Sequence, residues 1–337
     1  MRQNLHIEIA RTDNPEFSSM NRTSCASICD VLKRHYSHVG VTMIDRISDL
    51  DALVAKDPDL VFLGMKRIPA ADYADDIWLS EYLASRGIEF IGSPSTAVEF
   101  ELNKQHAKTV VQRAGLPTAE FFTSLPGEHV DRASLPLDFP LFVKPLHSGG
   151  GEGIAADSVV RTYAEFKHKI SSIHTKFRSA SLVEQYLSGR EFSVAILGNA
   201  GHDQLIMPIE IVTGANAAGD RVLGYTVKNN PELERVTAIT NVATRYLIST
   251  LAKNIFEALG ARDVGRIDIR MDADGDGHFL EANLVPGLST DNSYFFDAYR
   301  LNQGGNYEDM ILRIVEVGLG TDESAAPVQF PELVAGA

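Results

Sequence analysis

The chain has 337 residues, of which 44% are hydrophobic and 23% charged, and this length allows two or three packed units. The net charge of −14 argues against a general nucleic-acid binder, which needs positive charge to displace the counterions of phosphate. No run reaches the roughly eighteen apolar residues of a membrane span, and the first residues lack the pattern of a secretion signal. We therefore expect a cytoplasmic protein with neither nucleic acid nor membrane as a partner.

The first hundred residues alternate strand and helix patterns. Such alternation predicts a parallel sheet with helices on both faces, and we place this first α/β domain at residues 1–94. No G-x-G-x-x-G follows the first strand, which argues against a dehydrogenase. The expected strands are 5–10, 39–45, 59–65 and 88–94, and the expected helices are 24–36, 48–56 and 77–87. In the first helix Cys25 and Cys29 stand four residues apart, which is typical of packed thiols in a reducing setting.

The rest of the chain divides into a central unit at 95–187, a strand-rich unit at 188–320 and a polar tail at 321–337. We expect the central unit to open with one helix at 101–115, followed by strands and a further helix. In the third unit a long helix at 242–260 precedes two strands. The expected strands of both units are 139–145, 153–158, 181–187, 191–199 and 205–213, and the second central helix is 162–174.

The strongest chemical signal is the segment GRIDIRMDADGDGHFLEANLVPG, residues 265–287. Polar and apolar residues alternate on both sides of an Asp and Gly turn, which predicts a β-hairpin. Alternation places Arg266, Asp268 and Arg270 on one strand face, and Glu281 and Asn283 on one face of the returning strand. The hairpin can therefore gather Asp268, Glu281 and Asn283 as hard oxygen ligands of Mg²⁺, although a polar surface hairpin remains the alternative. A calcium loop starting at Asp272 is excluded, because its twelfth position is Asn283 rather than glutamate.

Two further segments indicate nucleotide binding. In FVKPLHSGGGEG, Lys144 supplies a point charge, and the backbone N–H groups of Gly149, Gly150 and Gly151 can approach phosphate oxygens in a mobile lid. In LVEQYLSGREFSVAIL, the backbone at 185–187 can meet an adenine edge, while a carboxylate holds the ribose hydroxyls. Either segment alone also fits an ordinary hairpin loop or strand end.

Taken in order, these segments resemble the D-alanine–D-alanine ligases and related ATP-grasp enzymes, from about Gly92 to Val317. The resemblance implies an ATP-grasp fold behind the small, doubly wound α/β domain. It also implies a homodimer and the use of ATP with Mg²⁺ or Mn²⁺. The residues that it assigns to phosphate are Lys104 and Lys144, to adenine Glu184, Gln185, Tyr186 and Leu187, and to ribose Glu191.

The resemblance further implies a reaction between small-molecule substrates. A substrate carboxylate attacks the γ-phosphate of ATP, and an amine then displaces phosphate from the acyl-phosphate to leave an amide. Arg266 and the backbone N–H of Gly287 would stabilise the oxyanion, a contribution of typically about 3 kcal/mol for one such donor.

The departures from the family fall where the substrates bind. The family's first loop is rich in glycine, but the corresponding segment here, RTDNPEFSSMNRTS, has none. In the phosphate loop, Gly150 and Gly151 stand where the family usually has two serines. The family's Gly-Glu-Asp-Gly element is reduced to Ala-Asp-Asp-Ile at residues 74–77. We therefore expect a specialised dipeptide or natural-product ligase, with Asp75 and Asp76 near a substrate ammonium. The alternatives are a cell-wall D-alanine–D-alanine ligase, another ATP-grasp branch, and a nucleotide-binding regulator without catalysis.

Overall fold

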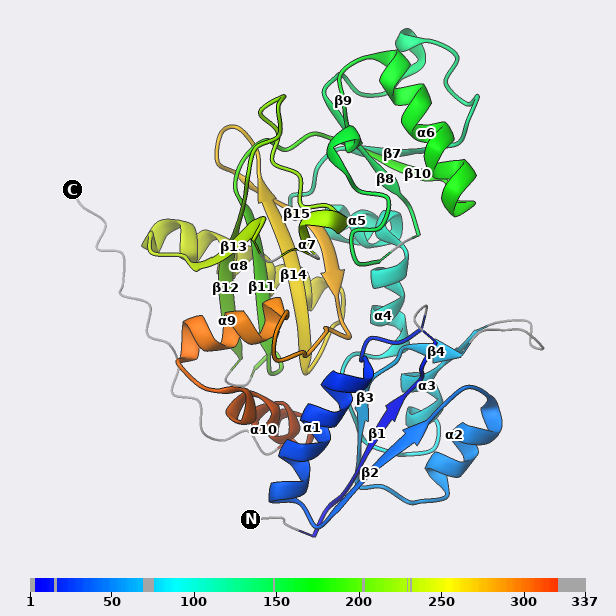
Figure 1. Cartoon of the computed structure of the whole chain (residues 1–337), viewed down its shortest axis with the longest axis vertical. Helices are drawn as coiled ribbons and strands as arrows, with labels where there is room; N and C mark the ends of the chain where they lie inside the picture. Colours follow the sequence, from blue (N-terminus) through cyan, green and yellow to red (C-terminus); the bar gives the residue numbers. More distant parts are fainter. Residues whose placement is uncertain are drawn as a thin grey trace.

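The structure is a computed structural model, and it describes residues 4–14, 17–68, 76–147, 149–201, 204–228, 230 and 232–320. The tail expected at 321–337 lies outside these ranges. Within them, no helix combines the length and the apolar character that a membrane crossing requires. Three large sheets follow one another along the chain, and Figure 1 shows the strand-rich sheet between the other two.

The first sheet is parallel, with strand order β2-β1-β3-β6. Alternate residues of its strands face opposite cores: Ile9 and Phe62 pack with α1, whereas Val61 and Leu63 pack with α2 and α3. Helices therefore cover both faces, as the sequence predicts. The elements are β1 (His6–Arg11), α1 (Arg22–His35), β2 (His38–Met43), α2 (Ile47–Val54), β3 (Leu60–Leu63), β4 (Arg67–Ile68), β5 (Ile77–Trp78), α3 (Leu79–Ala84) and β6 (Phe90–Ile91).

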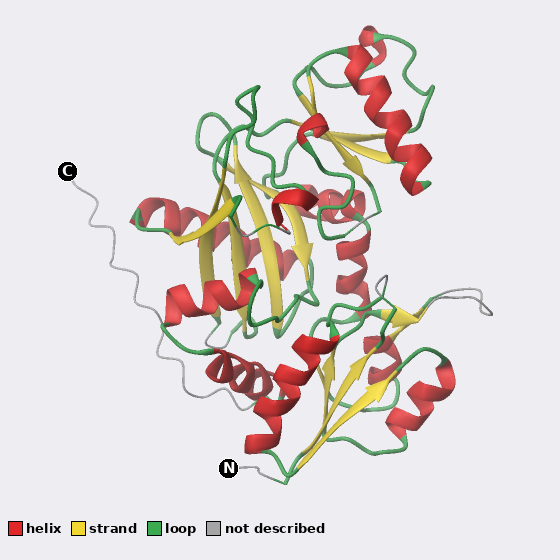
Figure 2. Ribbon diagram, in the orientation of Figure 1, coloured by secondary structure: helices red, strands yellow, loops and turns green. Residues whose placement is uncertain are grey.

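The second sheet is antiparallel, with order β7-β10-β8-β9, and α6 covers one of its faces (Figure 2). On α6, Phe166, Ile170 and Ile173 lie at helical spacing and bury themselves against Val143 and Val183. The elements are α4 (Ser95–Leu102), α5 (Lys104–Arg113), β7 (Phe121–Ser124), η1 (Arg132–Ser134), β8 (Leu141–Pro145), η2 (Ala156–Ser158), β9 (Val159–Val160), α6 (Tyr163–Phe177) and β10 (Ser181–Gln185).

Two expectations for this unit are wrong. The helix expected at 101–115 is the end of α4 and all of α5, because Asn103 leaves helical geometry with φ −116° and caps α5 by accepting the N–H of His106. The strand expected at 153–158 is a turn and the 3₁₀ helix η2. Only Val159 and Val160 pair with β8.

The third sheet is antiparallel, with order β13-β12-β11-β14-β15, and it forms the centre of the molecule (Figure 2). On one face α8 packs Ile248 and Ile255 near Val194, and on the other α9 packs Phe295 near Ala195. The elements are β11 (Glu191–Leu197), β12 (Leu205–Thr213), α7 (Tyr225–Lys228), β13 (Glu234–Ala238), α8 (Val242–Ala258), β14 (Val264–Met271), β15 (Gly277–Asn283), α9 (Tyr294–Gln303) and α10 (Tyr307–Gly318).

The last helix returns to the first unit. In α10, Ile311 and Ile314 share one buried cluster with Ile28, Leu32 and Ile91 of the N-terminal sheet and α1. Figure 1 shows α10 beside α1, far from the small upper sheet. The two cysteines of α1 are buried free thiols within the same cluster, as expected from their spacing.

Candidate active site

The hairpin of β14 and β15 is the centre of the candidate site. Its antiparallel register sets Asp268 opposite Glu281 and Arg266 opposite Asn283. Directly opposed residues of a hairpin share a face, so these side chains project together on one side. Ile267 is fully buried on the other face, which confirms the alternation predicted from sequence.

Asp268 is held by a dense hydrogen-bond network. Its Oδ1 accepts from Ser193 Oγ at 2.6 Å and Arg266 Nε at 3.0 Å, while its Oδ2 accepts from Arg266 Nη2 at 3.0 Å and Asn283 Nδ2 at 3.1 Å. Burial by itself disfavours the charge of Arg266, but Asp268 outweighs it and raises the pKa of the guanidinium. Arg266 is therefore a permanent cation fixed on this face.

The turn of the hairpin has a structural role. Asp272 Oδ1 accepts the N–H groups of Asp274 at 3.0 Å and Asp276 at 2.9 Å, and its Oδ2 contacts His278 Nε2 at 3.0 Å. The hydrogen bond with His278 lowers the pKa of Asp272 below its ordinary value. These aspartates close the turn, in agreement with their interpretation as turn residues.

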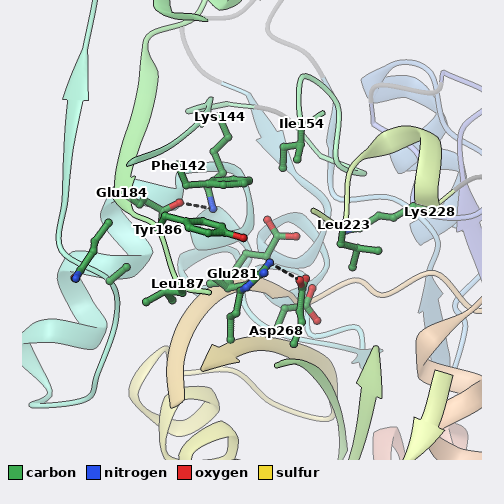
Figure 3. A pocket seen from close by; sticks show the side chains of 15 residues that line it. Phe142, Lys144, Ile154, Glu184, Tyr186, Leu187, Leu223, Lys228, Asp268 and Glu281 are labelled. Carbon is green, nitrogen blue, oxygen red and sulfur yellow. Dashed lines mark hydrogen bonds and ion pairs between the residues drawn. The ribbon is translucent and has the colours of Figure 1, made fainter. Parts of the chain in front are cut away.

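Three lysines surround Glu281. Burial alone would raise the pKa of this carboxyl group, but the charges of Lys228, Lys104 and Lys144 lower it to about 2. Burial lowers the pKa of Lys104, and the carboxylate of Glu281 opposes that effect. Cations from α5, β8 and α7 thus converge on one carboxylate, and Figure 3 shows Lys144 and Lys228 on different sides of the pocket that contains it.

Glu184 lines the pocket, but its carboxylate is engaged by lysines. Its Oε2 lies 2.8 Å from Lys144 Nζ, and its Oε1 lies 2.6 Å from the Nζ of Lys108. Burial lowers the pKa of Lys144, but Glu184 and Glu281 outweigh burial and raise it above its ordinary value. The sequence interpretation assigns Glu184 to adenine; in the structure its carboxylate pairs with the ammonium of Lys144, the lysine expected at phosphate.

The other end of the pocket is apolar and aromatic. The rings of Phe142 and Tyr186 lie nearly parallel, 15° apart in plane and 6.4 Å between centroids (Figure 3). Together with Leu187 and the backbone of Gln185 they form a wall suited to a flat heterocycle, because polar main chain and apolar side chains lie side by side. Further lining residues are Ala119, Ile154, Leu223 and Leu280.

Glu191 begins β11 at the edge of this wall. Its Oε2 accepts from Arg270 Nη1 at 3.0 Å, and the guanidinium of Arg270 lies 5.5 Å from the centroid of the Tyr186 ring. Burial raises the pKa of Glu191 even though Arg270 opposes that effect. The carboxylate lines the pocket where the ribose was expected.

The glycine loop approaches α7 across the pocket. Gly150 and Gly151 have φ of +62° and +78°, which glycine adopts without strain. A Cβ built on Gly151 would lie 3.3 Å from the backbone N of Tyr225, whose N–H donates to Ile154 O at 3.3 Å. Gly149 stands at the start of this loop, and no atom outside its chain neighbours lies within 4 Å of a Cβ built on it. Loop and helix together bring Ile154 and Lys228 over the pocket.

Gly287 follows the hairpin in an irregular segment. Its carbonyl accepts from Ser293 Oγ at 2.6 Å, and no atom outside its chain neighbours lies within 4 Å of a Cβ built on it. Of the two aspartates expected near a substrate ammonium, Asp76 pairs with Arg67, whereas Asp75 lies outside the described residues.

Sequence reasoning missed Lys108, Lys228 and Arg270 as parts of this site. Lys108 stands four residues after Lys104, and that spacing on one helix face was a usable signal. Lys228 lies in a polar stretch without periodicity, where no local pattern marks it. Arg270 was placed on the correct strand face but given no partner.

The hairpin also fits a magnesium ion by the chemistry of its donors. Across the part of the chain that the structure describes, no three His, Cys, Asp or Glu side chains gather as a metal site of their own. In the hairpin, Asp268 and Glu281 would supply two carboxylates and Asn283 an amide oxygen, leaving further positions to water and nucleotide phosphates. That incomplete oxygen set is what Mg²⁺ commonly accepts from proteins.

Comparisons with known proteins agree with this geometry. A family model described as D-ala D-ala ligase C-terminus matches residues 110–316. A D-alanine–D-alanine ligase of Chromohalobacter salexigens is 29% identical over 279 residues, covering 81% of each chain. One of Stutzerimonas stutzeri is 30% identical over 238 residues, covering 70% of this chain and 71% of that protein. The D-alanine–D-alanine ligase of Bacillus anthracis complexed with ATP has the same fold, with a TM-score of 0.70 and 19% identity over 94% of this chain and 97% of that one. The chain therefore belongs to the D-alanine–D-alanine ligase family, and it is an ADP-forming ATP-grasp carboxylate–amine ligase that uses ATP and Mg²⁺.

Proposed function

We propose that this ligase joins two molecules of D-alanine into a dipeptide. The observation that carries the reaction type is the convergence of Lys104, Lys144 and Lys228 on Glu281, beside the face that holds Arg266. This arrangement suits transfer of a phosphoryl group to a carboxylate, since it combines cations for phosphate with oxygen donors for a metal. The family model and the curated relatives favour D-alanine over the specialised substrate expected from the N-terminal loop.

The residues divide the work of the first step. Tyr186, Leu187 and the backbone of Gln185 orient the base, and Glu191 accepts from the ribose hydroxyls. Lys104 and Lys144 hold the phosphates while a substrate carboxylate attacks the γ-phosphorus, which forms an acyl-phosphate and releases ADP. Asp268, Glu281 and Asn283 would hold Mg²⁺, which would supply positive charge to the phosphate oxygens.

In the second step the amine of the other amino acid attacks the acyl carbon. Charge develops on the carbonyl oxygen, where the Arg266 guanidinium and the N–H of Gly287 stabilise it. Phosphate then leaves as the tetrahedral intermediate collapses to the amide, and the amine loses its proton. The closed glycine loop excludes water, which would otherwise hydrolyse the acyl-phosphate.

The test supplies D-alanine alone with ATP and Mg²⁺, and measures phosphate release together with dipeptide. We expect turnover on the order of 1 per second or more. L-alanine serves as the substrate control, and Arg266→Met as an enzyme control that should lose dipeptide formation.

A specialised amino-acid ligase is the second candidate, and one observation favours it. In the loop after β1, Asp13 pairs with both Arg11 and Arg22, so this loop carries an ion-pair network in place of glycines. If D-alanine gives no phosphate but another pair of L- or D-amino acids does, this candidate replaces the first. ATP binding without turnover on any pair would indicate a regulator instead.

A further inference from the structure

Three separate parts of the chain meet at Glu101 on α4. Its Oε2 accepts the backbone N–H groups of Leu284 at 3.0 Å and Val285 at 3.3 Å. Its Oε1 lies 2.6 Å from Nζ of Lys66, which follows β3 in the N-terminal unit. Only 12% of the Glu101 side chain and 18% of the Lys66 side chain are exposed, so water competes little for these contacts.

The segment that Glu101 holds lies between two parts of the reaction centre. It starts after Asn283 at the end of β15 and leads to Gly287, whose N–H we assign to the oxyanion. Leu284 and Val285 lie beyond the ladder of β15, so their N–H groups need a partner outside the sheet. One carboxylate oxygen satisfies both, and hydrogen bonds to a charged acceptor are the strong ones.

The other side of Gly287 is fixed as well. Ser293, the cap of α9, donates its hydroxyl to Gly287 O at 2.6 Å. The short irregular segment is therefore anchored before and after the glycine. Anchors on both sides restrict how the peptide between Pro286 and Gly287, which carries the glycine N–H, can turn. Such restriction matters because a donor stabilises a transition state best when it is held in place beforehand.

Lys66 orients the carboxylate of Glu101. The ammonium holds Oε1, so that Oε2 is turned to the two amides. The backbone of Lys66 is itself fixed, because its carbonyl accepts from Leu79 N at 2.9 Å. Glu101 also opposes the effect of burial on the pKa of Lys104, three residues further along the chain. The contact thus connects the N-terminal unit to the phosphate lysine and the oxyanion segment together.

We propose that Glu101 is a positioning residue which, oriented by Lys66, sets segment 284–287 so that Gly287 N–H faces the reacting carbonyl. The oxyanion role of Gly287 rests on the proposed function, whereas the anchoring of the segment does not. Two independent measurements therefore test the two parts.

The first measurement is amide hydrogen exchange, which needs no substrate. In the native enzyme the amides of Leu284 and Val285 should be protected, and Glu101→Ala should accelerate their exchange about tenfold or more. Glu99→Ala is the matched control, since Glu99 is an exposed glutamate on the same helix. Equal exchange in native enzyme and Glu101→Ala would overturn the anchoring, whatever the substrate proves to be.

The second measurement is steady-state kinetics with the best amino-acid pair. Glu101→Ala should lower kcat on the order of 10²-fold with KM for ATP within about twofold of native. Glu101→Gln keeps an oxygen acceptor, so it should recover most of that loss. Lys66→Met should lower kcat less than Glu101→Ala does.

The double variant Lys66→Glu with Glu101→Lys tests whether Glu101 positions segment 284–287 or only links the N-terminal unit to α4 through an ion pair. It restores an ion pair between the same segments, but an ammonium cannot accept an N–H. We expect it to recover the melting temperature but not kcat. Recovery of kcat to within about twofold of native would show a purely structural bridge and would sink the proposal.

Discussion

Lys108 and Glu184 form an ion pair, 2.6 Å between Nζ and Oε1, in which the lysine side chain is fully buried and the glutamate only 3% exposed. The ammonium also donates to Thr118 Oγ1 at 2.7 Å and to the carbonyl of Phe279 at 3.0 Å. Burial lowers the pKa of Lys108 to about 8, against the attraction of Glu184. Lys108 thus joins α5 to β10 through Glu184 and to β15 through Phe279, next to the pocket that Glu184 lines.

Removing one partner of this buried pair should be costly. We expect Lys108→Met to lower the free energy of unfolding by about 3–5 kcal/mol, because Glu184 keeps its charge with one cation fewer. Urea denaturation measures the loss. Lys253→Met is the matched control: its pair with Glu257 is exposed on α8, and its loss should cost about 0.5 kcal/mol or less. Equal effects of the two substitutions would contradict this account.

Glu281→Gln tests the metal site. The amide keeps the shape of the side chain but removes the charge that faces Mg²⁺, so kcat should fall on the order of 10²–10³-fold. Circular dichroism should show an unchanged fold. Glu257→Gln, on the surface of α8, should leave turnover unchanged. Near-normal Mg²⁺-dependent ATP consumption by Glu281→Gln would reject the assignment.

The same carboxylate should shape the acid stability of the protein. Its pKa falls from an ordinary 4.5 to about 2 in the fold, so the native state binds fewer protons than the unfolded chain between these values. This contribution to stability is complete above pH 4.5 and is lost as the pH falls towards 2. Relative to the native enzyme, Glu281→Gln should therefore show a shallower loss of unfolding free energy from pH 4.5 downwards. Parallel slopes for the two proteins would rule out the lowered pKa.

Two glycines in or near the glycine loop should differ in how much stability the protein loses when each is replaced by alanine. Gly153 has φ +76°, and a Cβ there would lie 2.5 Å from Pro145 Cγ and 2.9 Å from Phe177 Cε2. Gly153→Ala should therefore destabilise by about 1–3 kcal/mol. Gly149 has neither a positive φ nor a neighbour within 4 Å of its Cβ position, so Gly149→Ala should stay within about 0.5 kcal/mol of native. Thermal unfolding of both variants checks the difference.

Local patterns account for what the sequence predicts well. Period-2 alternation predicts that Arg266 and Asp268 share one face of β14, and that Glu281 and Asn283 share one face of β15. The turn alone does not bring these faces together: Ile269 pairs with Phe279 but Asp268 pairs with Glu281, so a bulge at Leu280 turns Glu281 towards Asp268. The pairs Lys108–Glu184 and Lys66–Glu101 join distant segments, and no local pattern encodes them. The sequence interpretation also assigned no helix after Leu288, although Ser293 and Asn306 cap α9 and α10 by accepting N–H groups three residues on.

The hydrophobic core that α10 shares with the first unit bears on which sheet can move relative to the others. Residues from both ends of the described chain pack in one apolar cluster together with the central sheet, so these parts share a single hydrophobic core. The small sheet under α6 has a core of its own, drawn only from residues 135–183, with 122, 137, 139, 163 and 177 packed around it. If the site opens, we expect this small sheet to move as a unit about the chain that enters it before β7 and leaves it after β10. Nucleotide would then exchange at the edge of the small sheet, while segment 284–287 and the hairpin of β14 and β15 would stay with the central sheet.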